Sequence, residues 1–289
     1  MKPSNFNIYK IVLFLFVLFV LYVVIYTIIL HTDITTGKKG NLKKDGYTMF
    51  RNLLSREEIE NLKKESKKGN YKKVKEYLVK HPKIEKKIQK ELNKKYHFQD
   101  YILIIQKSSV HTCHRDYNGD FFNEGQNHPS YTVIIYLEDM EKCLGVIPTS
   151  HKDVNSHNVN LTNQVENVLC KKGDMILFNS NLIHVGTINE RNDNLRVQMK
   201  ITHEEDVESL SYYEKYNKVL NQDNTLPKGL IKFQQNLSCM FPYISNLTQS
   251  DNIKTYTGDN VGEKMGIFEK LYSYFFYGNS NFYNLPNAF

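Results

Sequence analysis

The sequence lacks several patterns that mark small metal-binding or nucleic-acid-binding proteins. Its four cysteines, at positions 113, 143, 170 and 239, include no C-x-x-C pair. Their spacing suggests neither a zinc finger nor a dense disulfide framework, and it leaves the compartment open. No internal repeat is evident, and no recognised nucleic-acid-binding module accompanies the net charge of +7. Nucleic acid is therefore a disfavoured partner.

The chain does contain one long hydrophobic run. Among its 289 residues, the twenty from 11 to 30 include a single clearly polar side chain, Thr27. That length matches the ~20 residues that cross a bilayer core, whereas the apolar region of a cleaved signal peptide has only ~7 to 15. The run therefore predicts a retained, single-pass transmembrane anchor after a short tail of residues 1–10.

The side of the membrane on which the body lies is left open by the sequence. More lysines follow the anchor closely than precede it, which favours a cytoplasmic body. Three glycosylation-type sequons begin at Asn160, Asn236 and Asn246, and they favour the opposite side if they carry glycans.

Basic residues are concentrated after the anchor. Between residues 63 and 95 lysines recur in pairs, interleaved with glutamates and with Ile84, Ile88 and Leu92 at helical spacing. This pattern predicts amphipathic helices with a solvated basic face. Contact of that face with anionic lipid beside the anchor is the alternative.

The pattern of apolar and polar residues changes along the rest of the chain. Residues 31–45 are polar and predict a linker, residues 46–51 predict a short strand, and Ser55 with Glu58 predicts a helix that starts near residue 56 with a capping box. Short apolar runs between turn residues then predict strands, which favours a β-sandwich or barrel. These runs lie at 101–106, 131–139, 144–148, 174–178, 182–186 and 196–202.

Beyond residue 205 the pattern predicts a C-terminal extension, 206–289. Helices are expected over 211–220 and 229–241, followed by an aromatic-rich tail. These aromatic side chains either pack onto the core or form an interfacial or substrate-facing surface.

A short polar motif lies inside the β-rich region. Residues i and i+2 of a strand point to the same side, so His114 and Asp116 can present an imidazole and a carboxylate together. These are two parts of the 2-His-1-carboxylate triad of non-haem iron sites, and His184, after the 174–178 strand, is the candidate third. An H-x-D alone is also compatible with an ordinary polar turn.

A candidate anion-binding residue follows. In the 196–202 strand, Val197, Met199 and Ile201 share one face, so Arg196 points to the other. An inward arginine needs an anionic partner, because an unpaired buried guanidinium is costly. A dicarboxylate cosubstrate would supply one by bidentate pairing.

With these residues in place, the chain resembles the Fe(II)/2-oxoglutarate dioxygenase superfamily, and within it the phytanoyl-CoA dioxygenase family. The resemblance implies a mainly β fold, a double-stranded β-helix or jelly roll with flanking helices, over residues 46–205, behind the N-terminal transmembrane helix. The matching segments are DGYTMFRNLLSREEIENL (45–62), HRD (114–116), GVIPTSHK (145–152), GDMILFNSNLIH (173–184) and NLRVQMKI (194–201).

The resemblance also implies roles for individual residues. His114, Asp116 and His184 would bind Fe(II), and Arg196 would pair with the distal carboxylate of 2-oxoglutarate. Further candidate contacts with the cosubstrate are Lys107, just ahead of the motif, and Thr187. Thr187 is a candidate because the adjacent Gly186 lies where the family often has a hydroxyl-bearing residue. A second departure from the family pattern is Thr149, since the family usually has glycine at that position.

Two hypotheses for function follow. The first is a membrane-anchored hydroxylase that uses Fe(II), 2-oxoglutarate and O2, releases succinate and CO2, and acts on an unidentified small molecule, with a lipid or acyl chain among the candidates. The second is a catalytically silent module that serves as a membrane-tethered binding or scaffold protein. The first is favoured because the three ligand positions and the arginine are all retained.

Overall fold

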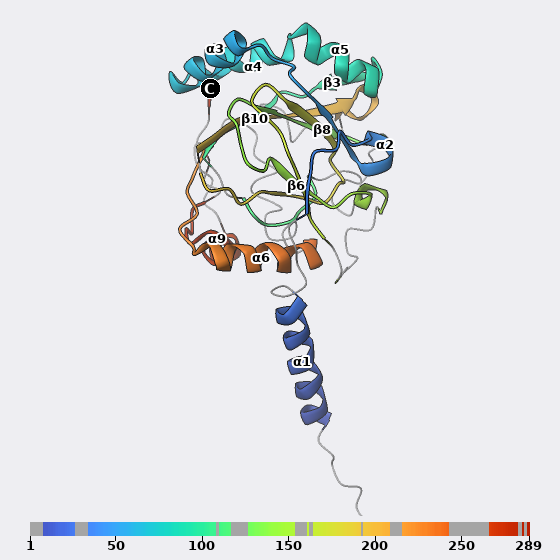
Figure 1. Cartoon of the computed structure of the whole chain (residues 1–289), viewed down its shortest axis with the longest axis vertical. Helices are drawn as coiled ribbons and strands as arrows, with labels where there is room; N and C mark the ends of the chain where they lie inside the picture. Colours follow the sequence, from blue (N-terminus) through green and yellow to red (C-terminus); the bar gives the residue numbers. More distant parts are fainter. Residues whose placement is uncertain are drawn as a thin grey trace, which may run out of the picture.

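The computed structural model describes residues 8–26, 34–107, 110–116, 127–153, 161, 164–191, 193–208, 216–242, 266–282, 285 and 288–289. Figure 1 shows a β-rich body with helices at its two ends and one further helix, α1, that extends away from it. The helices are α1 (Ile8–Ile25), α2 (Leu42–Asp45), α3 (Arg56–Lys67), α4 (Tyr71–Val79), α5 (Pro82–Glu91), α6 (Lys228–Met240) and α9 (Ile267–Tyr277), with short 3-10 turns at Ser150–Lys152 and Glu204–Asp206.

The strands form two sheets within the described residues. The larger sheet has seven strands in the order β11-β4-β10-β5-β8-β2, with β3 paired to β10, and the smaller has four in the order β1-β7-β6-β9. This mainly β arrangement with flanking helices agrees with a jelly roll. The strands are β1 (Ile34–Thr36), β2 (Tyr47–Phe50), β3 (Tyr96–Phe98), β4 (Tyr101–Lys107), β5 (Tyr131–Tyr136), β6 (Leu144–Val146), β7 (Glu166–Val168), β8 (Met175–Asn179), β9 (His184–Gly186), β10 (Asp193–His203) and β11 (Tyr216–Asn221).

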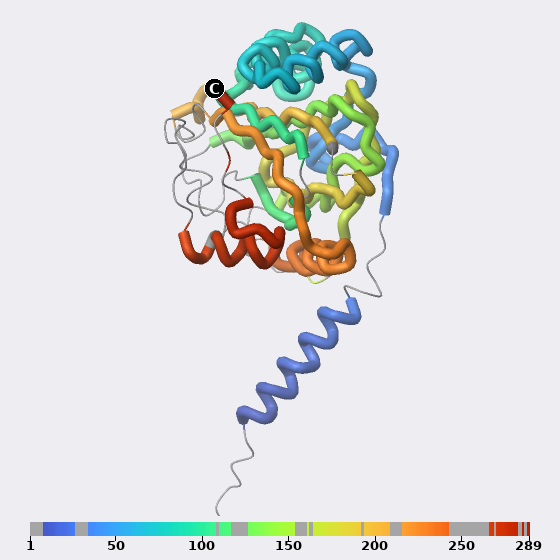
Figure 2. The backbone as a smooth tube through the Cα atoms, turned by 90° about the vertical axis from the view of Figure 1, so that its left-hand side faces the viewer, coloured from blue at the N-terminus to red at the C-terminus, as the bar shows by residue number. Residues whose placement is uncertain are grey.

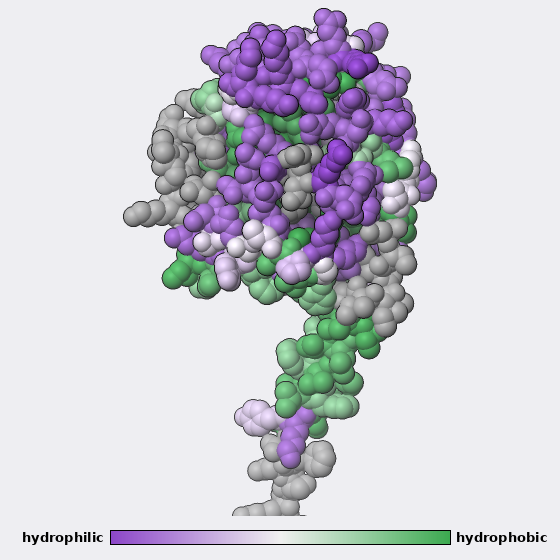
Figure 3. Space-filling view, turned by 60° about the vertical axis from the view of Figure 1, so that its left-hand side comes forward, coloured by the Kyte–Doolittle hydropathy of each residue, from purple (hydrophilic) through white to green (hydrophobic). Residues whose placement is uncertain are grey.

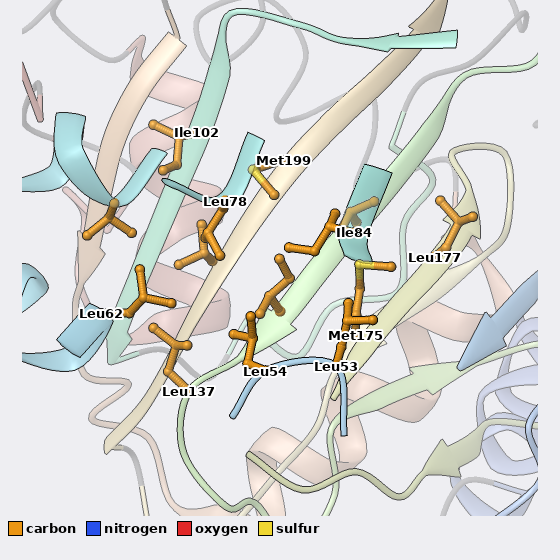
Figure 4. Packing of buried hydrophobic residues seen from close by; sticks show 14 of the residues in the cluster. Leu53, Leu54, Leu62, Leu78, Ile84, Ile102, Leu137, Met175, Leu177 and Met199 are labelled. Atoms are coloured by element: carbon orange, nitrogen blue, oxygen red, sulfur yellow. The ribbon is translucent and has the colours of Figure 1, made fainter. Parts of the chain in front are cut away.

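Helices α3 to α5 cover the outer face of the larger sheet. The predicted helix start is confirmed, because the Ser55 side chain accepts a hydrogen bond from the Glu58 N–H and the Glu58 carboxylate accepts one from the Ser55 N–H. The apolar residues of these helices, among them Leu62, Leu78 and Ile84, pack on the sheet residues Ile102 and Met199 (Figure 4).

A second core lies between the two sheets and includes Ile134, Tyr136 and Phe178 from the larger sheet and Leu144 and Val146 from the smaller. The two faces of β10 therefore differ, as predicted. Its residues Val197, Met199 and Ile201 belong to the helix-covered core, so the alternate side chains of β10 face the space between the sheets.

The hydrophobic run of residues 11–30 is helical over part of its length. Helix α1 spans Ile8–Ile25, and residues 27–33 lie outside the described part of the chain. The helix is long and apolar enough to cross a membrane, a test that a signal sequence near the N-terminus also passes. Within α1 only Val23 is buried, so the body does not cover the apolar surface of this helix.

The C-terminal region differs from its prediction in one element. Residues 216–220, expected to be helical, belong to strand β11, which pairs in parallel with β4. The ring of Tyr216 stacks on that of Tyr101 at 4.6 Å. Packing against a neighbouring strand has overridden the helical preference of this polar, lysine-containing segment. The expected helix over 229–241 is confirmed as α6.

The four cysteines form two disulfides, which the sequence did not suggest. Cys113 pairs with Cys239 of α6, and Cys143 pairs with Cys170. The partners are 126 and 27 residues apart in the chain, and such connectivity cannot be deduced from spacing alone.

The two ends of the body differ in character. Helices α3 to α5 lie at one end, and α6 and α9 lie at the end from which α1 extends (Figures 1 and 2). Figure 3 shows hydrophilic residues over the first end and hydrophobic residues along the second. The lysine-rich helices are therefore not beside α1, which argues against their contact with lipid at the anchor and leaves the solvated-face interpretation.

One of the three sequons is buried. Asn236 lies within α6 with 2% of its surface exposed, so a glycan at this position does not fit the folded structure. Asn160 and Asn246 lie outside the described residues.

Candidate metal centre

The three residues predicted as metal ligands meet at one end of the space between the sheets. His184 begins β9 of the smaller sheet, and His114 forms an isolated antiparallel bridge with it. Each backbone N–H of this pair donates to the other residue's carbonyl, at 3.0 and 2.9 Å. Segments 70 positions apart in the chain, at His114 and His184, are thus joined directly by main-chain hydrogen bonds.

Both imidazoles are oriented by their own neighbouring backbone. His114 Nδ1 lies 2.8 Å from the Thr112 carbonyl oxygen, and His184 Nδ1 lies 2.9 Å from that of Leu182. A carbonyl only accepts, so each Nδ1 carries the proton and each Nε2 presents a lone pair. A histidine that binds a metal through one ring nitrogen typically donates a hydrogen bond from the other, as both imidazoles do here.

The Asp116 carboxylate completes the cluster with one of its oxygens. Oδ1 lies 3.6 Å from His114 Nε2 and 3.4 Å from His184 Nε2. The three candidate ligand atoms therefore all lie within 4.8 Å of one another, close enough to share one ion. Two imidazoles and one carboxylate are the donor set of a non-haem iron site.

The other oxygen of Asp116 is held by the larger sheet. Oδ2 accepts a hydrogen bond from the Thr132 hydroxyl at 2.7 Å and lies 2.5 Å from Lys200 Nζ. Lys200 also donates to Thr132 Oγ1 at 2.8 Å. Thr132 and Lys200 hold Oδ2, whereas Oδ1 faces both imidazoles, and this division favours monodentate ligation.

Electrostatics keep this cluster in a metal-binding protonation state. Burial alone would raise the pKa of Asp116, but the charge of Lys200 and the two imidazoles hold that pKa well below its usual range. Burial also lowers the pKa of His184, against the opposing effect of Asp116. A deprotonated carboxylate beside a neutral imidazole is what ligation needs.

The segment that carries the motif is anchored on both sides. The side chain of Arg115 points opposite to those of His114 and Asp116, and its Nη1 donates to the Ser150 carbonyl at 3.0 Å and to the Asn181 carbonyl. On the preceding residue, the Cys113 N–H donates to Ser238 Oγ of α6 at 2.9 Å. Together with the Cys113–Cys239 disulfide, these contacts fix the motif between α6 on one side and the segments at Ser150 and Asn181 on the other.

Gly186 explains one departure from the family pattern. A Cβ built at this position would lie 2.1 Å from the Val110 carbonyl oxygen, so no larger residue fits without movement of the backbone. Because residue 186 has no side chain, segment 110–114 and strand β9 can approach each other closely here. A hydroxyl-bearing side chain at 186 is excluded by the same contact.

Arg196 is buried in the space between the sheets without a carboxylate partner. Its Nη1 donates to the Asn194 carbonyl at 3.2 Å and to Asn194 Oδ1 at 2.5 Å, and among the described residues no Asp or Glu forms an ion pair with it. Burial lowers its pKa to about 10. A buried guanidinium of this kind is suited to an anionic ligand.

The other two predicted cosubstrate contacts are already engaged elsewhere. The Thr187 hydroxyl donates to the Lys142 carbonyl at 2.7 Å. Lys107 is 40% exposed and its Nζ lies 3.5 Å from Asp223 Oδ2. These contacts do not involve the metal cluster, and the role of both side chains with a cosubstrate stays a prediction.

Two further residues next to the motif, Cys113 and His111, carry atoms that can bind metals, and both are occupied. The thiol of Cys113 is consumed by its disulfide. His111 donates from Nε2 to Gln234 Oε1 at 3.0 Å and accepts at Nδ1 from Asn224 at 3.2 Å. Neither residue has a donor atom left for a metal, so both are structural.

A second cluster, His128, His203 and Glu205, also brings three donor atoms within 4.8 Å of one another. Its two imidazoles stack face to face at 3.7 Å, and Glu205 is shared between His128 at 2.9 Å and Lys95 at 3.1 Å. Because the Glu205 carboxylate is already engaged by His128 and Lys95, we assign this cluster to a network of polar contacts at Glu205 rather than to a second metal centre.

Sequence reasoning missed Lys200 and Thr132. The signal for Lys200 was available, because it alternates with Arg196 on the inward face of β10, and an inward lysine needs an acidic partner as much as an arginine does. Thr132 carried no comparable signal, since a threonine in a strand is ordinary. Its role depends on the register that pairs Lys200 with Thr132.

A two-sheet β fold with a His-x-Asp and distal His cluster and an inward arginine defines the class of non-haem iron, 2-oxoglutarate-dependent oxygenases. Residues 75–196, less than half of the chain, match the family model for phytanoyl-CoA dioxygenase. This segment contains all four of the residues that define the class. Over this segment the chain is similar to the phytanoyl-CoA dioxygenase family, the family that its motifs resemble.

Solved structures resemble the chain only distantly. The non-haem alpha-ketoglutarate-dependent epimerase SnoN from nogalamycin biosynthesis is 13% identical, with a TM-score of 0.46 over 56% of this chain and 80% of its own. Apo HygX from Streptomyces hygroscopicus is 15% identical, with a TM-score of 0.45 over 56% and 84%. AviO1 from Streptomyces viridochromogenes is 16% identical, with a TM-score of 0.43 over 58% and 96%. No curated protein matches the chain.

Proposed function

We propose that the protein is a membrane-anchored Fe(II)/2-oxoglutarate-dependent dioxygenase that hydroxylates its substrate and releases succinate and CO2. The observation that carries the proposal is the convergence of His114 Nε2, His184 Nε2 and Asp116 Oδ1 within the space between the sheets. The fold proposed for this core is the double-stranded β-helix, with the smaller sheet facing the larger one across the site.

The residues fit iron. Two neutral imidazoles and one carboxylate oxygen would hold Fe(II) on one side and leave its other positions for cosubstrate and O2. When bound, Fe(II) supplies the activation of O2 that couples decarboxylation of 2-oxoglutarate to hydroxylation of a C–H bond. Thr132 and Lys200 would orient the carboxylate, and the Thr112 and Leu182 carbonyls would orient the imidazoles.

The residues also fit a dicarboxylate cosubstrate. Arg196 shares the inward face of β10 with Lys200, four residues further along, or about 13 Å at the rise of a strand. A diacid that reaches from the metal towards the interior would place its distal carboxylate at this buried guanidinium. Thr187 and Lys107 are the remaining candidates for cosubstrate contacts, and each would have to give up a present hydrogen bond or ion pair.

The location proposed for the enzyme is a membrane, with α1 as a single-pass anchor. The two disulfides favour a body on the oxidising, non-cytoplasmic side, because disulfides persist in secretory compartments and are rare in the cytosol. This outweighs the lysine count around the anchor, since counting charges on short flanks gives only a weak bias.

The substrate class is a small molecule or a lipid. The end of the body that carries the hydrophobic surface lies next to α1 (Figure 3), which favours a substrate with an acyl chain. A catalytically silent scaffold is the competing hypothesis, and activity distinguishes the two.

The test is succinate release by the purified full chain supplied with Fe(II), O2 and 2-oxoglutarate. Uncoupled turnover without the prime substrate is expected for the wild type and is expected to vanish in His114→Ala and Asp116→Ala. The variant Glu60→Gln, at an exposed position of α3, serves as the control and should retain activity. Equal succinate from all four proteins, or none from the wild type, would favour the silent module.

A further inference from the structure

Helix α9 presents a hydrophobic face to solvent. Its residues Ile267, Phe268, Leu271, Tyr274 and Phe275 are 57–79% exposed. They recur at the spacing that gathers side chains on one side of a helix. Five large apolar side chains on one short helix form a contiguous surface of the kind that marks a contact with a partner or a membrane.

The opposite face of α9 is fixed to the body. Tyr272 and Tyr277 are buried in a cluster with Ile105 and Leu220 of the neighbouring strands. The Tyr277 hydroxyl lies 2.9 Å from Thr112 Oγ1. Because this face is already packed, the helix cannot rotate to bury its exposed residues in the body.

The exposed face lies at the end of the body next to α1. Figure 2 shows α9 lying across the long axis of the molecule at the same end as α6, with α1 extending from that end. Seven residues, 27–33, connect Tyr26 to Ile34, so the two residues are eight Cα steps and at most about 28 Å apart. A membrane that contains α1 therefore lies close to this end of the body.

The other end of the body is unsuited to lipid. Helices α3 to α5 expose lysines and glutamates, and Figure 3 shows this end as hydrophilic. The molecule is thus polarised along one axis, with its exposed hydrophobic side chains on α1 and on the end that α1 adjoins.

We propose that the exposed face of α9 docks into the interfacial layer of the bilayer that holds α1. This inference rests on the proposed anchoring of α1. A helix that lies flat, buries an aromatic and aliphatic face by ~5–10 Å and keeps its charges outside is the form of an interfacial membrane helix. Lys270, exposed on α9, suits the headgroup region. The bilayer is favoured over a protein partner because the anchor already holds it against this end of the body.

Docking would orient the metal centre relative to the membrane. Helices α6 and α9 hold residues 111–113, directly before the motif, through the His111–Gln234 and Thr112–Tyr277 hydrogen bonds and the Cys113–Cys239 disulfide. A body fixed at both α1 and α9 cannot swing on its linker. The site would therefore be held at a set height and angle above the lipid.

The absence of tryptophan from the chain makes a sharp test possible. Single tryptophans are introduced into the full chain as Phe268→Trp and Phe275→Trp on α9. Leu18→Trp reports on α1, and Tyr77→Trp on α4 reports on the opposite end. All four positions are at least 40% exposed, so the substitutions leave the buried core in place. Tyr77→Trp also removes the hydrogen bond to Glu58, and its fold is checked by circular dichroism before use. Each protein is reconstituted into phosphatidylcholine vesicles with and without bromine on the lipid acyl chains.

Docking predicts blue-shifted emission and loss of fluorescence in brominated vesicles at positions 268 and 275, with no loss at position 77. Quenching at 18 but none at 268 and 275 overturns the docking and leaves the anchor intact. A blue shift at 268 without quenching means that protein, such as a second copy of the chain, covers the face, and this also overturns it. No quenching at 18 overturns the proposed anchoring itself.

Discussion

Asp116 uses its two carboxylate oxygens differently. Oδ1 faces the imidazoles of His114 and His184, whereas Oδ2 is held by Thr132 and Lys200. Both Asp116 and Lys200 are buried, so each charge depends on the other for compensation. The ion pair between Asp116 and Lys200 therefore stabilises the folded site and also orients the Asp116 carboxylate.

We predict strong coupling between Asp116 and Lys200. In metal-free protein, Asp116→Asn and Lys200→Met should each lower the free energy of unfolding by about 3–5 kcal/mol, because each leaves a buried charge without its partner. The double variant should lose less than either single variant. Chemical denaturation of the four proteins of this cycle in detergent measures the coupling, and losses that simply add would contradict it.

Thr149 carries backbone strain where the family usually has glycine. Its φ is 71°, a left-handed conformation that is costly for a β-branched residue. Thr149→Gly should raise the free energy of unfolding by up to about 1 kcal/mol, since the relief of ~1–2 kcal/mol exceeds the entropic cost of glycine. Thr149→Ala keeps the Cβ and should gain little. Thermal melts that show equal gains for both would contradict this explanation.

At the scale of elements, the start of α3 depends on a charged cap. The Ser55 backbone N–H and hydrogen bonds from Tyr77, His81 and the Ser55 side chain lower the pKa of Glu58 to about 2, against the opposing effect of burial. A lowered pKa in the folded state means stability that is present above pH 4.5 and is lost as the pH falls towards 2.

Glu58→Gln should therefore destabilise the protein by about 1–2 kcal/mol near neutral pH. The difference from the wild type should shrink between pH 4.5 and about 2, because protonation then removes the same charge from the wild type. Unfolding followed at a series of pH values measures this, and a difference that does not depend on pH would contradict it. Tyr77→Phe removes one hydrogen bond to the carboxylate and should reproduce part of the loss.

The elements show which features of the fold the sequence could predict. The alternation in β10 predicted both its core-facing residues and the inward Arg196, because side-chain direction follows from the period of a strand. The capping box predicted the start of α3, because it too depends only on residues that are close together in the sequence. Strand β11 could not be predicted, because its conformation is imposed by pairing with β4.

The candidate site was predictable in part. The His-x-Asp motif, the distal histidine and the family segments identified the three residues that the structure brings together, although only the fold brings His184 to His114. Thr132 and the disulfide at Cys113 were missed, since each depends on a residue far away in the sequence. The exposed face of α9 was anticipated only as one of two alternatives for the aromatic tail.

At the scale of the whole molecule, the disulfides link stability to compartment. Replacing Cys113 and Cys239 by serine should cost about 3–5 kcal/mol, and more than the same change at Cys143 and Cys170, because the first pair closes the longer loop. A second prediction concerns the side of the membrane on which the body lies. In microsomes the body should be protected from added protease, and a thiol reagent should label its cysteines only after the disulfides are reduced. A protease-sensitive body with four free thiols would place it in the cytosol and contradict the proposed orientation.

The central claim is that His114, Asp116 and His184 bind one ferrous ion and that Arg196 binds the distal carboxylate of 2-oxoglutarate. Anaerobic titration of the full chain with Fe(II) and then 2-oxoglutarate tests it most directly, through the visible charge-transfer absorption that a 2-oxo acid develops when it chelates Fe(II). One equivalent of Fe(II) should bind to the wild type and none tightly to His114→Ala or His184→Ala. Arg196→Met should keep iron but need at least tenfold more 2-oxoglutarate, since it loses a charged hydrogen-bond pair worth about 1.5–3 kcal/mol. Wild-type protein that develops no such absorption, or alanine variants that bind iron equally well, would contradict the claim.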